Sequence, residues 1–231
     1  MTTRSRYLHS RAVGALVAVC LLAVLATSCL PVAPSLGRGT PVRRVLLLGD
    51  SVAYGLFGTS PRVHEPLTAM LADRGIETHV TGYPAENPIF NWPMNLPWLL
   101  RMQHEIETWD PDMVIIQTTL FVEADEPGKV EEYRKAIAEL MDLAQSRGAH
   151  VYIVKHHGVP GTPEAHQRDV AEVLQNQAAA PRGIFTIPLD WWMDRCAGGL
   201  MGDGVHLTEA GQRCNALAMT YAVDQLRGAV G

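Results

Sequence analysis

The chain has 231 residues, of which 47% are hydrophobic and 19% charged, with 24 acidic and 19 basic side chains. This length allows one domain with a sizeable core, but not two full domains once the N-terminal segment is discounted. The formal charge of -5 becomes -8 when the three arginines of the first 28 residues are removed. An acidic body of this kind argues against nucleic acid as a partner.

Residues 1–28 have the pattern of an export signal. A positive beginning is followed by an uncharged apolar run over residues 12–26, which is too short to span a membrane comfortably. The end of the run, before Cys29, resembles the lipobox of bacterial lipoproteins, although Ala26 stands where that pattern prefers leucine. Lipidation of Cys29 and ordinary cleavage before it are both open. We therefore expect an exported protein that is either lipid-anchored to the cell membrane or secreted.

Residues 29–41, rich in proline, glycine and serine, have the composition of a flexible tether, and residues 42–231 form the predicted domain. Within this domain, apolar runs alternate with helical patterns, as is typical of βαβ units and a parallel sheet. The predicted strands cover residues 45–48, 76–81, 113–117, 151–154 and 184–187. The predicted helices cover residues 63–73, 96–109, 128–147 (expected to be the longest), 162–177 and 207–226.

Two short motifs lie at opposite ends of this predicted domain. Gly49-Asp50-Ser51 directly follows the first strand, at the edge where open α/β sheets place their ligands. Asp203-Gly204-Val205-His206 directly precedes the last helix. A serine hydroxyl needs an imidazole to take its proton and a carboxylate to orient that imidazole. These motifs predict a catalytic serine, histidine and aspartate.

The remaining residue of the first motif, Asp50, is expected to accept backbone hydrogen bonds in the turn. A structural alternative exists for the second motif. Asp203 would then cap the final helix or turn, and His206 would be an ordinary surface histidine.

These motifs make residues 42–227 resemble the SGNH hydrolase family, also called GDSL esterases. The resemblance implies a flavodoxin-like α/β/α sandwich with a five-stranded parallel sheet. It also implies Ser51 as nucleophile, His206 as base and Asp203 as orienting acid. The expected activity is ester hydrolysis or acyl transfer through an acyl-enzyme, with no cofactor and no metal.

The family's usual oxyanion donors are incomplete in this sequence. Glu86 and Phe121 stand where a glycine after the second strand and an asparagine after the third are expected. Losing one such donor costs on the order of 3 kcal/mol of transition-state stabilisation, so other groups substitute or the enzyme is weak. The candidate substitutes are Gly82, Asn87, Thr118 and Thr119.

Similar departures occur among envelope SGNH proteins that modify cell-wall polymers. This resemblance favours O-acetyl groups of a cell-wall glycan as the substrate, with a small ester-bearing molecule also open. The alternative is a non-catalytic envelope module that keeps the fold and binds polysaccharide or a partner protein.

Two cysteines, Cys196 and Cys214, remain in the predicted mature domain apart from Cys29. In an oxidising exterior such a pair is most simply a disulfide, and two independent thiols are the alternative. A disulfide would close a loop around Asp203 and His206. This closure is worth roughly 3 kcal/mol on the loop-entropy model and would restrain the segment that carries the base.

Other residue types at the same edge have less specific spacing. His156 and His157 follow the fourth strand, but a metal site would need a further ligand such as His166 or Asp190, and nothing in the spacing requires one. Polar lining of a crevice or plain packing is the preferred interpretation. Four tryptophans are expected in or beside the loops at this edge: Trp92, Trp98, Trp191 and Trp192. They could stack on a ligand or simply be buried, and both interpretations are open.

Overall fold

The structure is a computed structural model that describes residues 41–54, 64–82, 98–118, 127–155, 163–199 and 206–230. The chain divides into two units, Met1–Ser35 and Leu36–Gly231, and every described residue belongs to the second. The predicted export signal, Cys29 and most of the tether therefore lie outside the described residues.

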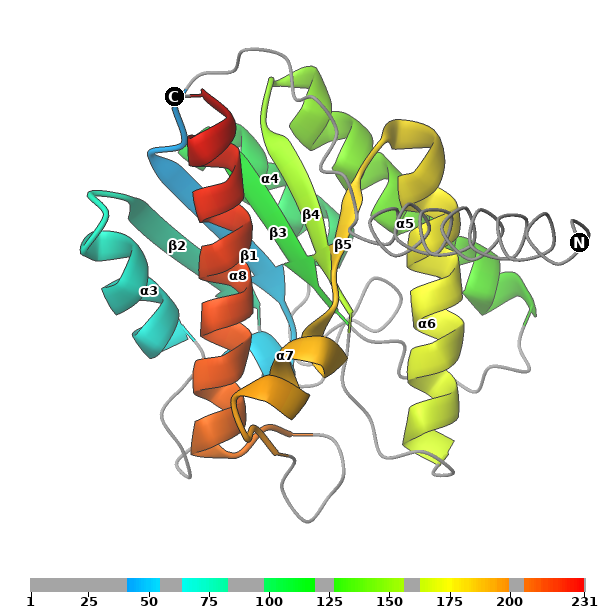
Figure 1. Ribbon diagram of the computed structural model, residues 1–231. Helices are drawn as coiled ribbons and strands as arrows, with labels where there is room; N and C mark the ends of the chain where they lie inside the picture. Colours follow the sequence, from blue (N-terminus) through cyan, green and yellow to red (C-terminus); the bar gives the residue numbers. More distant parts are fainter. Residues whose placement is uncertain are drawn as a thin grey trace, which may run out of the picture. The chain divides into compact units, whose positions relative to one another are not determined.

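Five parallel strands form a single sheet in the order β2-β1-β3-β4-β5 (Figure 1). The strands are β1 (Arg44–Gly49), β2 (Glu77–Gly82), β3 (Met113–Gln117), β4 (His150–Val154) and β5 (Phe185–Ile187). This sheet agrees with the flavodoxin-like sandwich of five parallel strands that the resemblance to SGNH hydrolases implied. The chain runs from β1 to one side of the sheet and then crosses to the other, so the strand order reverses between β1 and β3. Sheets of this type bind ligands at that switch point.

Helices cover both faces of the sheet (Figure 1). One face carries α3 (His64–Ala72), α7 (Leu189–Arg195) and α8 (Glu209–Val230). The other carries α4 (Trp98–Trp109), α5 (Pro127–Ser146) and α6 (Pro163–Ala179). A short helix α2 (Ser51–Tyr54) follows β1, and the 3-10 turn η1 (Ala180–Arg182) precedes β5. Within the described part of the chain, we find no helix with the length and apolar character needed to cross a membrane.

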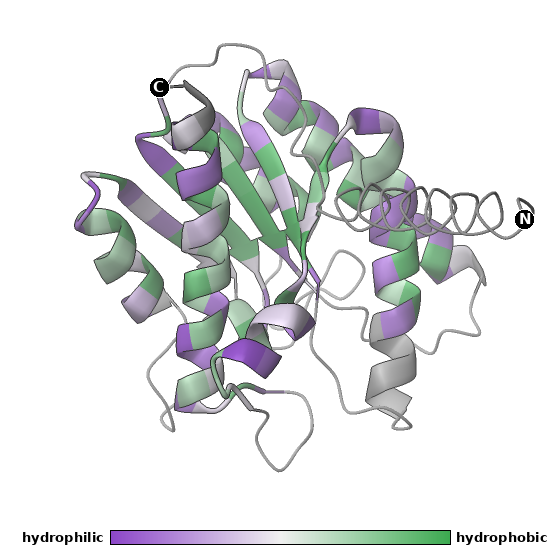
Figure 2. Ribbon diagram, in the orientation of Figure 1, coloured by the Kyte–Doolittle hydropathy of each residue, from purple (hydrophilic) through white to green (hydrophobic). Residues whose placement is uncertain are grey.

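The side chains of β1 alternate between two hydrophobic cores, because successive residues of a strand point to opposite faces. Val45 and Leu47 pack in the core under α8, whereas Leu46 and Leu48 pack in the core under α4 and α5. Strand β3 is buried on both faces, as its continuous apolar run predicted. Figure 2 shows the result as largely hydrophobic central strands, a more hydrophilic edge strand β2 and helices of mixed hydropathy.

Some helix predictions require correction. Helices α2 and α7 were not predicted, because four and seven residues are too few to show a helical period. The last helix begins at Glu209 rather than at 207, since Thr208 caps it and accepts a hydrogen bond from the Gly211 amide at 3.2 Å. Among the described residues, α8 is longer than α5, 22 residues against 20, so the helix expected to be the longest is not.

Candidate active site

Ser51 is the first residue of α2, directly after the tight turn that follows β1. The preceding residue, Asp50, is fully buried, and its Oδ1 accepts a hydrogen bond from the Val52 amide at 2.8 Å. This contact is the turn-stabilising role expected for Asp50. Ser51 is itself 4% exposed, so the turn holds its side chain within the protein rather than on the surface.

Two glycines bring neighbouring backbone close to this turn. Gly49 and Gly82 are paired in the register of β1 and β2. A β-carbon on Gly49 would overlap Ala53 of α2, and one on Gly82 would overlap the Gly49 carbonyl. Gly82 also has a φ of 149°, which L side chains rarely adopt. Both positions therefore require glycine, and β2 packs directly against the strand end that leads to Ser51.

The structure brings His206 to Ser51 from the other end of the domain. His206 Nε2 lies 2.9 Å from Ser51 Oγ, although the two residues are 155 positions apart. In the tautomer with its proton on Nδ1, the imidazole accepts the serine hydroxyl hydrogen at Nε2. This is the arrangement in which a histidine can take the proton of a serine during nucleophilic attack.

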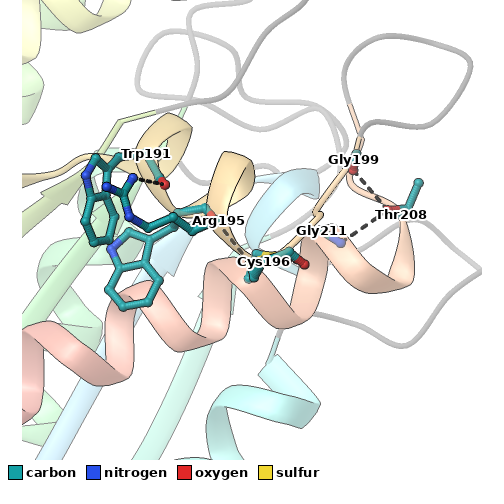
Figure 3. The surroundings of a disulfide bond; sticks show 8 residues. Trp191, Arg195, Cys196, Gly199, Thr208 and Gly211 are labelled. Atoms are coloured by element: carbon teal, nitrogen blue, oxygen red, sulfur yellow. Dashed lines mark hydrogen bonds between the residues drawn. A yellow bond between two sulfur atoms is a disulfide. The ribbon is translucent and has the colours of Figure 1, made fainter.

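Backbone contacts at Thr208 fix the chain just after His206. The Thr208 amide donates to the Gly199 carbonyl at 2.9 Å, and the Thr208 hydroxyl donates to the same oxygen at 3.1 Å (Figure 3). Leu207, between Thr208 and His206, is buried in the core beside α8. The segment that carries His206 is thus held on its C-terminal side by a cap and an anchored apolar side chain.

A disulfide joins Cys196, at the end of α7, to Cys214 in α8, with the two Cα atoms 6.0 Å apart (Figure 3). The prediction of this disulfide is confirmed. It encloses residues 197–213, which include His206, and lies close in sequence to the Gly199–Thr208 contacts. The disulfide therefore links the end of α7 to α8, and the Gly199–Thr208 contacts link the residues after α7 to the beginning of α8.

The other sequence candidates fall in different places. Asp203, Asn87 and Thr119 lie outside the described residues. Gly82 and Thr118 lie at the carboxyl ends of β2 and β3, which is the same edge of the sheet as Ser51. The Thr118 carbonyl, which is buried, accepts hydrogen bonds from α5 and α6, and its own side chain is fully enclosed.

Those hydrogen bonds come from a buried polar cluster that sequence reasoning missed. Tyr133 Oη donates to the Thr118 carbonyl at 3.2 Å, and Gln175 Nε2 donates to the same carbonyl at 2.8 Å and to Tyr133 Oη at 2.6 Å. Burial raises the pKa of Tyr133 far above its ordinary value, and the negative charge of Asp50 adds to the rise. The phenol therefore stays protonated and remains a donor. The sequence feature that indicates this cluster is the presence of polar residues on the apolar faces of α5 and α6.

The histidine and tryptophan candidates divide between described and undescribed residues. His156, His157 and Trp92 lie outside the described residues. Asp190, a possible third metal ligand, is paired with Lys155 at 3.1 Å. Across the described ranges, no group of three or more His, Cys, Asp or Glu side chains is arranged to hold a metal ion.

Three of the four tryptophans are described. Trp98 is buried in the core under α4, so burial accounts for it. Trp191 is 45% exposed, and the guanidinium of Arg195 lies 3.4 Å from its ring centroid. Trp192 packs between Trp191 and Tyr221, with ring centroids 5.1 and 5.4 Å away. These rings stack mainly with one another and with arginine.

The chain matches a known protein family. The family model described as GDSL-like Lipase/Acylhydrolase matches residues 47–214, a segment that runs from β1 into α8 and includes both Ser51 and His206. No curated protein matches the chain.

Solved structures share the fold at low sequence identity. An α/β hydrolase enzyme from the metagenome of Lake Arreo is 18% identical, with a TM-score of 0.61 over 84% of this chain and 99% of that one. A GDSL-like lipase from Bacteroides thetaiotaomicron is 15% identical, with a TM-score of 0.57 over 83% and 93%. A catalytic mutant of an acetylxylan esterase from Geobacillus stearothermophilus is 16% identical, with a TM-score of 0.56 over 80% and 95%.

Proposed function

We infer that this chain, which belongs to the GDSL-like lipase/acylhydrolase family and is an esterase-type hydrolase, uses Ser51 as its nucleophile and His206 as its base. The observation that carries this assignment is the 2.9 Å contact between His206 Nε2 and Ser51 Oγ. The contact joins a motif after the first strand to a motif before the last helix. It is the pairing that activates a serine hydroxyl, which is a weak nucleophile by itself.

In the proposed mechanism, Ser51 Oγ attacks the ester carbonyl carbon while His206 Nε2 takes the hydroxyl proton. His206 then gives that proton to the leaving alkoxide, and the acyl group remains on Ser51. Water, deprotonated by His206, hydrolyses the acyl-enzyme, releases the acid and restores the serine. A sugar hydroxyl in place of water would give acyl transfer. Asp203, three residues before His206, is the proposed orienting acid for the imidazole.

The proposed oxyanion donors are the backbone at Gly82 and the groups of Thr118, with Asn87 and Thr119 as further candidates. Support for the first two comes from their position at the carboxyl ends of β2 and β3, the strands on either side of the one that leads to Ser51. The buried cluster around Tyr133 holds the main chain in place at the end of β3, because two donors bond to the Thr118 carbonyl; this carbonyl oxygen is an acceptor and is not itself an oxyanion donor. A fixed peptide is what electrostatic stabilisation of a transition state requires.

The proposed substrate is an O-acyl group, most simply acetyl, on a glycan of the cell envelope. Support comes from the export signal pattern in residues 1–28 and from the fold shared with the acetylxylan esterase. The proposed domain organisation is a signal over 1–28, a tether over 29–41 and the enzyme domain over 42–231. Incorporation of radiolabelled lipid, abolished by Cys29→Ser, would support a membrane anchor, and its absence from the wild type would favour a secreted protein.

The experiment that tests the function measures acetate release from an O-acetylated glycan of the cell envelope and from p-nitrophenyl acetate. We expect Ser51→Ala to lower both rates by a factor of 10³ or more, because the acyl-enzyme can no longer form. Ser146→Ala is the matched control, since Ser146 lies at the exposed end of α5 and its hydroxyl donates only to the Leu143 carbonyl.

Different results of this experiment would contradict the nucleophile, the substrate class or the enzymatic activity. Equal rates for wild type and Ser51→Ala would refute the nucleophile. Turnover of p-nitrophenyl acetate without release from any acetylated glycan would refute the substrate class alone. No turnover of either ester, together with retention on cell-wall material, would favour the non-catalytic binding module.

A further inference from the structure

We propose that Gln117 and Asn215 form a positioning pair that sets the distance between Ser51 and His206. The inference rests on the proposed use of these two residues as nucleophile and base. Asn215 Nδ2 donates a hydrogen bond to Gln117 Oε1 at 3.0 Å, across 98 positions of the chain. Both side chains are fully buried.

Gln117, at one end of the pair, lies on the strand that neighbours β1, which leads to Ser51. Gln117 is the last residue of β3 and is paired with Gly49 in the register of β1 and β3. A β-carbon on Gly49 would lie 3.1 Å from the Gln117 carbonyl oxygen, so the two backbones are in close contact. Gly49 is followed directly by Asp50 and Ser51. A displacement of Gln117 is therefore passed to the serine turn.

The other end of the pair is attached to the helix that follows His206. Asn215 lies in the second turn of α8, which begins three residues after His206. Other side chains of α8 bind neighbouring helices: Cys214 is bonded to α7, and Asp224 binds Arg74 just after α3. Of the side-chain hydrogen bonds recorded for the described residues, the Asn215–Gln117 bond is the one that joins α8 to the sheet.

The energetics favour a positioning role over a stabilising one. Gln117 Nε2 and Asn215 Oδ1 are buried and make no hydrogen bond among the described residues. Two carboxamides thus lose their hydration for one mutual hydrogen bond, whereas apolar side chains of similar size would avoid this cost. A hydrogen bond is directional and short, while apolar contacts tolerate sliding. The pair therefore fixes the position of α8 along its own axis relative to the sheet. This in turn fixes the position of His206, which directly precedes α8.

The test is an exchange of the two amides. Gln117→Asn shortens one side chain by a methylene and breaks the bond while keeping a buried amide, and Asn215→Gln lengthens the other. We expect Gln117→Asn to lower kcat for p-nitrophenyl acetate about 10- to 100-fold, because small displacements of catalytic groups have effects of this size. KM should stay within about twofold. The double variant Gln117→Asn/Asn215→Gln should recover kcat to within about threefold of the wild type.

A neighbouring buried amide provides the control. Gln212 lies one turn before Asn215 on α8, is almost fully buried, and its Oε1 makes no hydrogen bond to any residue that the structure describes. Gln212→Met should change stability but keep kcat within about twofold. Asn215→Leu, which removes the bond without adding length, should lower kcat as Gln117→Asn does, and it supplies the answer if Gln117→Asn does not fold.

Three results would overturn the positioning role. They are unchanged kcat in the folded single variants, an equal loss of kcat in Gln212→Met, and failure of the double variant to recover. Ser51→Ala separates this inference from the proposed function. If Ser51→Ala loses activity but the Gln117 and Asn215 variants keep the wild-type kcat, the positioning role alone is wrong. If Ser51→Ala keeps full activity, the assignment of Ser51 is wrong.

Discussion

At Gly82 the requirement for glycine is both conformational and steric. The residue has a φ of 149°, and a side chain there would meet the Gly49 carbonyl. Gly75, in the turn before β2, also has a positive φ, of 70°, but a β-carbon there meets nothing within 4 Å. A side chain at Gly75 would cause backbone strain alone, whereas a side chain at Gly82 would cause backbone strain and crowding next to Ser51. Comparing variants of the two glycines therefore distinguishes the two effects.

Gly82→Ala should lower the free energy of unfolding by about 2–5 kcal/mol, from the strained φ and the overlap together. It should also lower kcat, because the Gly49 strand end must move. Gly75→Ala should cost about 1–2 kcal/mol and leave kcat unchanged. Urea unfolding and esterase assays measure both quantities. Similar kcat values for the two variants would show that Gly82 does not support the serine turn.

Among the helices and strands, those with a long and continuous apolar pattern could be predicted from the sequence. The bounds of β3 were predicted as they are found, because five buried residues in succession leave little ambiguity. The fold class followed from strands alternating with helices. Helices α2 and α7 are too short to show a period, and their place is set by packing against strand ends and by the disulfide.

The disulfide between α7 and α8 should contribute about 3 kcal/mol to stability, since it closes a loop of 18 residues in the unfolded chain. We therefore expect Cys196→Ala/Cys214→Ala to unfold at a lower urea concentration than the wild type. Dithiothreitol should shift the wild type toward the variant and leave the variant unaffected. Identical unfolding curves for the oxidised wild type and the variant would contradict this role.

At the start of β4, burial lowers the pKa of His150, against the opposing effect of the Asp112 carboxylate. Between the lowered pKa of the folded state and the ordinary histidine pKa of 6.5, the unfolded chain binds a proton that the folded chain does not. The free energy of unfolding should therefore fall as the pH drops from 7.5 to 5.5. His150→Gln should show a smaller fall in urea unfolding at the two pH values. An equal fall in both proteins would exclude this histidine as the cause.

At the scale of the whole molecule, the candidate site depends on residues from opposite ends of the domain. Ser51 and His206 could be predicted because each has a local signature, a turn after a buried strand and a motif before a helix. Gln117 and Asn215 have no such signature. Each is a polar residue in an otherwise apolar stretch, and only the packing of α8 on β3 shows that they meet. The same holds for Tyr133 and Gln175, which meet at the Thr118 carbonyl.

Activation of Ser51 by His206 can be measured by covalent labelling with a fluorophosphonate followed by peptide mass spectrometry. We expect a single adduct on the peptide that contains Ser51, formed at least 10³-fold more slowly in His206→Gln because the hydroxyl then lacks its base. His104→Gln, on the exposed surface of α4, serves as the control and should label at the wild-type rate. Modification of another residue, or equal labelling rates in the wild type and His206→Gln, would contradict the account.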